Sequence, residues 1–166
     1  ALFLEGAITD ASSQQLKIVS SKEVSSKIVS GLPVEYDHVI IKGNIILDEL
    51  DLPTNVKRVS APLRINDSII EGDIYFNDTI FHSPILLRGS FINGLVLSNG
   101  SLFKSTADFS GSLFNSTTDF NGSSFNSTGD FRNISFNNDV YFRGSTFNGD
   151  SIFRDSKFKS KVNLGY

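Results

Sequence analysis

The chain of 166 residues contains no cysteine, methionine or tryptophan. Without cysteine it can form no disulfide, no thiolate nucleophile and no cysteine-ligated metal site. No run approaches the roughly 18 consecutive apolar residues that a membrane-spanning helix needs, so we expect no membrane span. The formal net charge of -3 is too small to indicate a nucleic-acid-binding surface, and we expect no nucleic-acid partner.

Histidine is also scarce, and the sequence offers no recognisable catalytic motif. His38 and His82 are the only two histidines; neither belongs to an H-x-x-x-H pair, and no G-x-S-x-G segment is present. We therefore expect both to be surface residues. The sequence predicts a protein that is not an enzyme, with no catalytic residues, no metal site and no cofactor.

Phenylalanine, in contrast, is abundant and regularly spaced. Of 15 phenylalanines, ten between residues 107 and 162 are separated alternately by five and six residues, within an eleven-residue phrase that is repeated along this stretch. A fixed short period indicates one structural unit stacked on itself. An eleven-residue period can also mark a right-handed helical coiled coil. That alternative is excluded because the residues between the phenylalanines are mainly Ser, Thr, Asn, Gly and Asp, which are poor helix formers.

Each five-residue unit resembles one short strand followed by a turn. The residue two before each phenylalanine is small or aliphatic, as in Ala107, Thr118 and Val140. Side chains two apart on an extended chain point the same way, so both positions are predicted to face the core. Twelve phenylalanines are the predicted core: Phe81, Phe103, Phe109, Phe114, Phe120, Phe125, Phe131, Phe136, Phe142, Phe147, Phe153 and Phe158.

A weaker form of this rhythm extends back towards residue 39, with aliphatic side chains such as Ile46 and Leu97 in place of phenylalanine. Two steps do not fit it. The step from Leu52 to Val59 is seven residues, across a predicted bulged corner at 53–55. The step from Ile92 to Leu97 is five where six is required.

The segment Ala107–Gly111, ADFSG, matches the repeat of the pentapeptide-repeat family, and the stretch 39–166 resembles a phenylalanine-centred variant of it. The resemblance implies a right-handed quadrilateral β-helix with one five-residue unit on each side and 22 residues in each coil. It further implies that residues 22 apart lie in columns. The implied columns are Leu87/Phe109/Phe131/Phe153, Ile92/Phe114/Phe136/Phe158, Phe120/Phe142/Leu164 and Phe81/Phe103/Phe125/Phe147.

The residues before this solenoid are predicted to form a flexible tail over 1–13 and a helical cap over 14–38. Ser20 and Glu23 have the spacing of a capping box, and Gly31 is a helix stop signal. The helix is predicted to begin at about residue 14 or 21 and to end at about 30. Its expected apolar face consists of Leu16, Val19, Val24, Ile28 and Val29.

The surface residues leave the function open. Seven N-x-S/T sequons are possible glycan acceptors, at Asn66, Asn77, Asn99, Asn115, Asn121, Asn126 and Asn133, although an Asn- and Ser-rich turn also generates this pattern by chance. Asp108, Asp119 and Asp130 recur every eleven residues and are expected to be solvated outward carboxylates, with Asp108 and Asp130 on one side. Arg132, Arg143 and Arg154 are expected to give mixed surface charge.

Two functions are compatible with these features. The first is a structural scaffold that binds an unidentified protein partner, with extracellular or cell-surface localisation expected and a cytoplasmic location as the alternative. An open end of the stack makes a homodimer plausible. The second, implied by the resemblance, is DNA mimicry that inhibits or protects a topoisomerase such as gyrase, although the repeats mix Arg and Lys with Asp and give no continuous acidic stripe.

Overall fold

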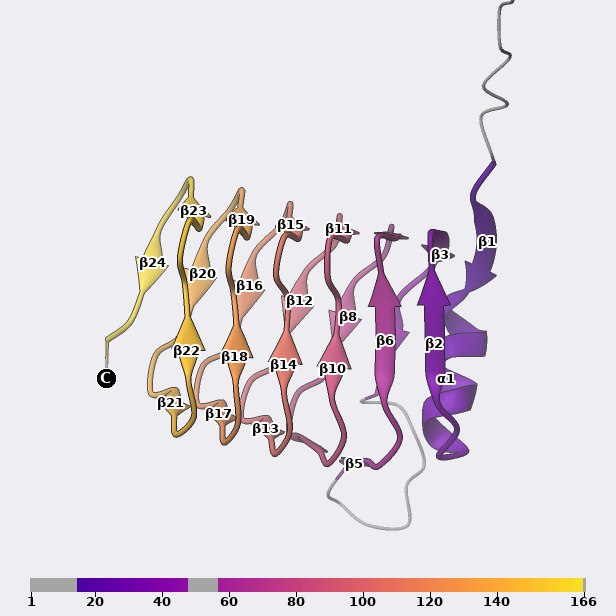
Figure 1. Cartoon of the computed structure of the whole chain (residues 1–166), viewed down its shortest axis with the longest axis horizontal. Helices are drawn as coiled ribbons and strands as arrows, with labels where there is room; N and C mark the ends of the chain where they lie inside the picture. The colour runs from indigo at the N-terminus through magenta and orange to yellow at the C-terminus, as the bar shows by residue number, and fades with distance from the viewer. Residues whose placement is uncertain (1–14, 48–56, 166) are drawn as a thin grey trace, which may run out of the picture.

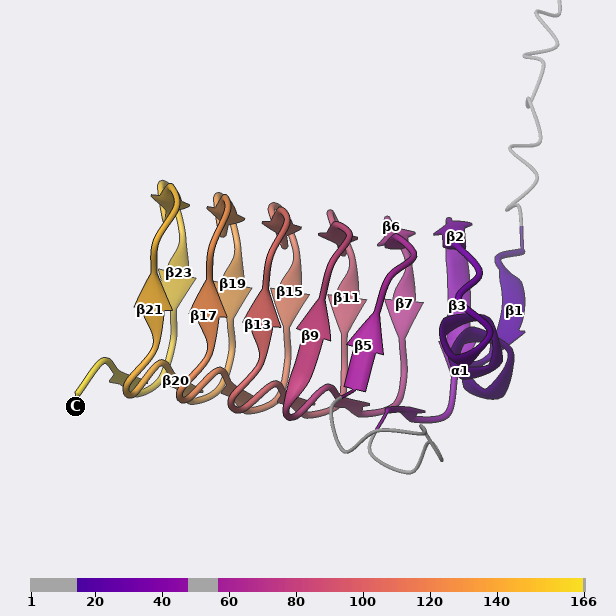
Figure 2. The ribbon, with the colours of Figure 1, turned by 90° about the horizontal axis from the view of Figure 1, so that it is seen from below.

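The computed structural model describes residues 15–47 and 57–165. The predicted tail at 1–13 and the predicted corner at 53–55 lie outside these residues. The described chain is a parallel β-solenoid of about six coils whose four sheets form the sides of a tube, as predicted (Figures 1 and 2). One helix, α1 (Ser21–Val29), lies at the N-terminal end of the stack.

The strands are short, and each sheet takes one strand from each coil. Sheet A contains β1 Lys17–Ser20, β3 Val39–Lys42, β7 Ile69–Ile70, β11 Phe91–Ile92, β15 Leu113–Phe114, β19 Ser135–Phe136 and β23 Lys157–Phe158. Sheet B contains β2 Val34–Asp37, β6 Leu63–Asn66, β10 Ile85–Leu86, β14 Ala107–Asp108, β18 Gly129–Asp130 and β22 Ser151–Ile152. Sheet C contains β4 Ile45–Ile46, β8 Ile74–Tyr75, β12 Val96–Leu97, β16 Thr118–Asp119, β20 Val140–Tyr141 and β24 Val162–Asn163. Sheet D contains β5 Lys57–Val59, β9 Thr79–Phe81, β13 Leu102–Phe103, β17 Ser124–Phe125 and β21 Thr146–Phe147.

The register confirms a 22-residue coil. Phe103 pairs with Phe125, and Phe125 pairs with Phe147. The first coil is longer, because Ile46 pairs with Tyr75, 29 residues on. The sequence separation between paired residues returns to 22 at Val59, which pairs with Phe81. The seven additional residues of the first coil therefore lie between β4 and β5.

The corners depend on residues that tolerate a left-handed backbone. The corner between sheets B and A has positive φ in every coil, and the residue there is His38, Asp67, Gly89, Gly111, Asn133 or Asp155. The residue at the corner between sheets C and D also has positive φ, and it is Asp78, Gly100, Gly122 or Gly144. Glycine adopts this conformation without a steric cost, and Asn and Asp tolerate it better than other residues. The Asn/Gly/Asp content of the repeat is therefore explained by two tight turns in each coil.

The core is filled by the predicted phenylalanine columns. The rings of Phe81, Phe103 and Phe125 stack with centroids 5.2 and 4.6 Å apart and nearly parallel planes. Phe131 stacks on Phe153 at 4.7 Å with an interplanar angle of 2°. Neighbouring columns meet edge to face, which is a favourable arrangement of aromatic rings. The phenylalanines of the predicted core from Phe81 to Phe142 are buried, Phe147 and Phe153 are partly buried, and Phe158 is 38% exposed.

Two inward positions differ from those predicted. Leu97 was expected in the core column, but it pairs with Asp119 and points outward, whereas the next residue, Ser98, is buried. Likewise Leu47 is buried, and its neighbour Ile46 is only half-buried. The five-residue step from Ile92 to Leu97 therefore does not exist. The inward residue after Ile92 is Ser98, six residues on, so a serine occupies this position of the inward column. Backbone pairing determines the register even where a large apolar side chain lies one residue away.

The N-terminal helix begins later than the earlier of the two predicted positions. Residues 17–20 form β1, which extends sheet A by pairing with β3, because the unpaired edge of that sheet is available to an extended segment rich in β-branched residues. Leu16 and Val19 are therefore not on the helix. Val24 and Ile28 form its buried face, and Val29 is 46% exposed.

Both ends of α1 are capped. The Ser20 side chain accepts a hydrogen bond from the Lys22 backbone N–H at 3.2 Å. The predicted capping box is incomplete, because Glu23 accepts a hydrogen bond from the Tyr36 hydroxyl instead. At the other end Gly31 has a φ of 66°, and the N–H of Leu32 donates to the Lys27 carbonyl, as in a Schellman motif.

The solenoid also begins earlier than residue 39. Strand β2 pairs with β6 over four residues, from Val34 with Leu63 to Asp37 with Asn66, so the end of the predicted cap belongs to the first coil. Within the described residues, no helix is both long enough and apolar enough to cross a bilayer.

Candidate interaction surface

An outward apolar column on sheet A is the most distinctive surface feature. Ile40, Ile69, Phe91 and Leu113 are paired in register on four successive coils. Each is half-buried, and each alternates with a core residue such as Ile92, so the column lies on the outer face. Ile18, which is 54% exposed, pairs with Ile40 and extends the column onto β1. With a coil spacing of about 4.8 Å, the column is about 19 Å long. Polar residues, Ser135 and Lys157, continue the same column towards the C-terminal end.

A polar column flanks this apolar one. The Asn115 amide nitrogen donates to the Asn93 side-chain oxygen at 3.1 Å, and the Asn137 amide nitrogen donates to the Asn115 side-chain oxygen at 3.0 Å. In the first two coils the same column is continued by Lys42 and Glu71, whose charged atoms are 4.0 Å apart. The outer face of sheet A thus carries an apolar centre beside a hydrogen-bonding edge, which is an ion pair in the first two coils and an asparagine column in the later ones. The part of the column from Ile69 to Leu113 could have been found in the sequence by comparing outward positions 22 residues apart, whereas Ile40 is 29 residues before Ile69.

The carboxylates on sheet B are buried, contrary to prediction. Asp108 and Asp130 do share one side, since they pair across β14 and β18, but each is only 4% exposed. Arg88 covers Asp108 with an Nε–Oδ2 distance of 2.5 Å, and Arg132 covers Asp130 with an Nη2–Oδ2 distance of 2.5 Å. The long arginine side chains lie over the strand and exclude water from the carboxylates.

These ion pairs have an electrostatic consequence for Asp130. Burial by itself would raise its pKa, but hydrogen bonds from the Arg132 side chain and backbone N–H, together with the arginine charge, outweigh burial and lower the pKa below its usual value. The carboxylate is therefore held in its charged, fully bonded form. This arrangement is structural and leaves Asp130 without a proton to transfer near neutral pH.

The seven sequon asparagines differ in their surroundings. Asn115, Asn126 and Asn133 are exposed, whereas Asn66, Asn77, Asn99 and Asn121 are half-buried. Three of the half-buried group, Asn66, Asn77 and Asn121, use the side-chain oxygen to accept a backbone N–H from the next coil. Since these three contribute to coil stacking, their presence needs no glycan to explain it. The use of any sequon as an acceptor stays a prediction.

Both histidines are exposed. His82 belongs to no cluster of possible metal ligands among the described residues, whereas Asp37, His38 and Asp67 bring three ligand atoms within 4.8 Å of one another. His38 Nδ1 is 3.0 Å from an Asp37 carboxylate oxygen.

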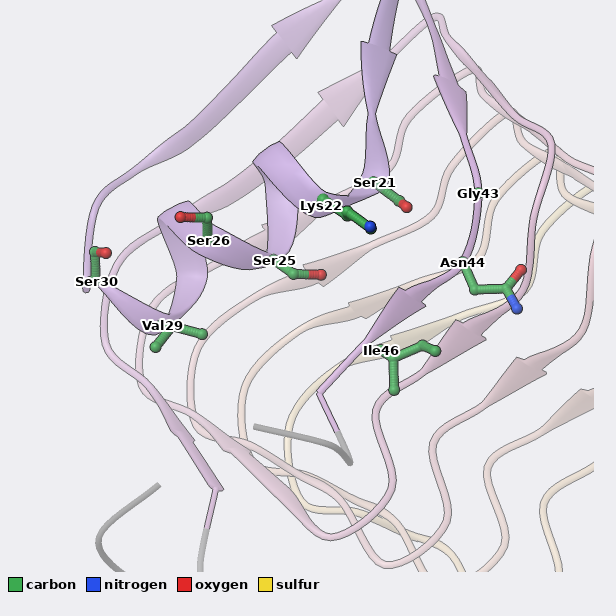
Figure 3. Close-up of a pocket in the computed structure, with 9 residues that line it drawn as sticks. All are labelled: Ser21, Lys22, Ser25, Ser26, Val29, Ser30, Gly43, Asn44 and Ile46. Carbon is green, nitrogen blue, oxygen red and sulfur yellow. The ribbon is translucent and has the colours of Figure 1, made fainter. Parts of the chain in front are cut away.

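A depression between α1 and β4 is drawn in Figure 3. It is lined by Ser21, Lys22, Ser25, Ser26, Val29, Ser30, Gly43, Asn44 and Ile46. Lys22 and Ser25 extend from the helix towards the side that carries Asn44 and Ile46. Among the described residues of this lining, Lys22 is the one titratable group. The serine hydroxyls and the Asn44 side-chain amide are the lining's other hydrogen-bonding side chains.

At the other end of the described stack, an apolar hollow is lined by Phe142, Phe147, Phe153, Phe158, Val162 and Leu164. Leu164 is 71% exposed. Lys157, Lys159 and Lys161 lie around this end and are exposed. Association of two such ends would bring like charges together, which is unfavourable at low salt. The homodimer through a solenoid end stays a prediction.

In comparisons with known proteins, no family model, no curated protein and no solved structure matches the chain.

Proposed function

We propose that this chain is a pentapeptide-repeat protein that acts as a non-enzymatic scaffold, binding a partner protein through the outer face of sheet A. The observation that carries the proposal is the in-register apolar column Ile40, Ile69, Phe91 and Leu113. The core is already filled by the inward columns, so these side chains are not needed to complete it. Apolar and aromatic side chains in register on a rigid surface are suited to the centre of a protein interface.

The size of the column constrains the partner. A stable dimer interface buries about 800 Å² on each partner, whereas this column is one residue wide and, with Ile18 included, about 19 Å long. It is suited to a narrow apolar segment, such as one face of a helix, held in a transient complex. The asparagine column beside it supplies neutral hydrogen-bonding groups at the edge of such a complex.

Family membership is supported by the four-sided coil and by the alternating spacing of five and six residues. Protein-interaction scaffolding is favoured over DNA mimicry because Asp108 and Asp130 are neutralised by arginines and buried. A DNA mimic must display its negative charge. We further propose an extracellular or cell-surface location, which the exposed sequons at Asn115, Asn126 and Asn133 permit.

Site-specific photo-crosslinking tests the interaction in cells that naturally produce the protein. A photoreactive phenylalanine analogue is placed at Phe91, and the same analogue at Lys104, an exposed residue after β13, serves as the matched control. We expect a discrete adduct with one partner from position 91 alone, and its loss when Leu113→Ser is added. Equal adducts from both positions, or none from position 91, would contradict the proposal.

A further inference from the structure

We propose that Asp37, His38 and Asp67 form a binding site for a divalent transition-metal ion, with Zn²⁺ as the best-matched biological ion. The three residues come from two successive coils. Asp37 ends β2, His38 forms the corner between β2 and β3, and Asp67 forms the same corner one coil later. The site would connect the first coil to the second at the end of the solenoid next to β1.

The geometry brings three suitable atoms together. The imidazole nitrogen and one oxygen from each carboxylate all lie within 4.8 Å of one another. Zinc binds nitrogen and oxygen ligands at about 2.0–2.2 Å, so ligands on one ion are at most about 4.4 Å apart. Small side-chain rotations are enough to close the group around an ion, and water can supply the remaining ligands because all three residues are exposed.

The backbone holds the two corners in a fixed relation. His38 and Asp67 both have positive φ, 52° and 48°. The His38 N–H donates to the Asn66 carbonyl at 3.2 Å, which ties the first corner to the second. The ligands are therefore placed by the coil register and not by a mobile loop.

The charges favour a cation. Within the described residues, no Lys or Arg forms an ion pair with Asp37 or Asp67; the one partner of Asp37 is the His38 ring. Asp108 and Asp130 differ in this respect, because each forms an ion pair with an arginine. Two carboxylates thus belong to the cluster, and among the described residues neither is ion-paired with a lysine or an arginine.

The donor set determines the class of metal. One imidazole nitrogen with two carboxylate oxygens suits Zn²⁺ and neighbouring first-row ions. Ca²⁺ and Mg²⁺ prefer oxygen ligands alone and in larger number. The imidazole thus distinguishes this cluster from a simple acidic patch, and the expectation that His38 is not a ligand is replaced by this proposal.

The test is a Zn²⁺ titration of the whole chain, followed by NMR of the two imidazole rings. We expect a saturable shift of the His38 signals while those of His82 stay unchanged, and a weaker response to Ca²⁺. His38→Gln and Asp67→Asn should each lower the Zn²⁺ association constant at least about tenfold. Asp78→Asn is the matched control, because Asp78 is also exposed with a φ of 52° but belongs to no possible ligand cluster among the described residues.

Three outcomes would overturn the site. They are parallel shifts of both histidines, which indicate unspecific imidazole binding, an absence of saturation up to about millimolar Zn²⁺, and equal effects of Asp67→Asn and Asp78→Asn. Circular dichroism of each variant verifies that the solenoid is still folded.

Discussion

Single phenylalanine side chains contribute to this fold in proportion to the rings they contact. Phe131 is fully buried and stacks on Phe153. It also contacts Phe109 at a tilt of 31° and meets Phe125 and Phe142 edge to face. Phe158 stacks on Phe136 in the last described coil and is 38% exposed. The same residue type therefore has unequal energetic weight along one column system.

Replacing Phe131 with alanine should lower the free energy of unfolding by about 3–5 kcal/mol, since a buried ring is lost and a cavity remains between two coils. Phe158→Ala should cost about 1 kcal/mol, because the wild-type ring is already partly hydrated. Urea unfolding monitored by circular dichroism measures both values. Equal losses at the two positions would contradict the stacked-column model.

Ser98 shows the opposite effect, because it is a polar residue in a column otherwise occupied by Phe76, Phe120 and Phe142. It is 1% exposed, and its hydroxyl has no hydrogen-bond partner among the described residues. Ser98→Ala should therefore leave stability unchanged or raise it by up to about 1 kcal/mol, since the desolvation penalty of the hydroxyl is removed. A loss above about 1 kcal/mol in the same unfolding assay would show that the hydroxyl is bonded in solution.

At the scale of elements, the helix and the strands of this protein are stabilised by different neighbours. The helix α1 has local caps at Ser20 and Gly31, and it packs on the first coil through Val24 and Ile28. The strands have two residues in most coils, too few to be stable alone, and depend on the coils above and below. The Asp130–Arg132 pair adds a charged link within one such strand and its corner.

The Asp130 pair gives sheet B a pH-dependent contribution. Because the pKa of Asp130 is lower in the folded than in the unfolded protein, the pair stabilises the fold above the unfolded value of about 4, and this contribution is lost as pH falls through the folded pKa. Asp130→Asn should lower the free energy of unfolding by about 1–2 kcal/mol at pH 7. This figure already allows for solvent screening of the ion pair, because the Arg132 side chain is partly exposed. Once the pH is below the folded pKa of Asp130, the variant and the wild type should converge.

Thermal unfolding over a pH series measures this difference, with Asp150→Asn, an exposed site, as the control. The Asp150 variant should show no comparable gap at neutral pH. A constant difference between wild type and Asp130→Asn at every pH would mean that the substitution acts through packing and not through charge.

For the whole molecule, the arrangement of charge and apolar surface determines which partners are possible. Four sheets surround a core that is continuous from Val19 to Phe142. The carboxylates Asp108 and Asp130 are neutralised, and the C-terminal end of the described stack carries three exposed lysines. Among the described residues, the solenoid therefore offers a narrow apolar face on sheet A, while arginines cover the two paired carboxylates of sheet B.

This charge distribution predicts no effect on DNA topology. In a gyrase supercoiling assay, the protein at low micromolar concentration should neither inhibit nor protect the enzyme, because Asp108 and Asp130 are buried under arginines and do not display their negative charge. A known gyrase inhibitor provides the positive control. Inhibition that scales with protein concentration would restore DNA mimicry as the function and contradict the scaffold proposal.

The sequence alone determined the repeat, its extended five-residue units and the inward position of the phenylalanines, because a period of five and six residues matches no face of a helix. The four-sided coil and its columns of residues 22 apart were implied by the resemblance to the pentapeptide-repeat family, and the strand register confirms them. The sequence also determined that the helix ends near Gly31, since the stop signal is local. The start of the helix depended on tertiary structure: Lys17–Ser20 form a strand because the edge of sheet A is next to them.

Other features depended on distant residues in the same way. The sequence could not show that Ser98 rather than Leu97 enters the core, because the register is determined by backbone bonds to the coils on either side. It could not show that Asp108 is buried, because the covering arginine is 20 residues away in the chain. The proximity of Asp37, His38 and Asp67 likewise depends on the longer first coil, whose 29-residue offset no simple repeat would predict.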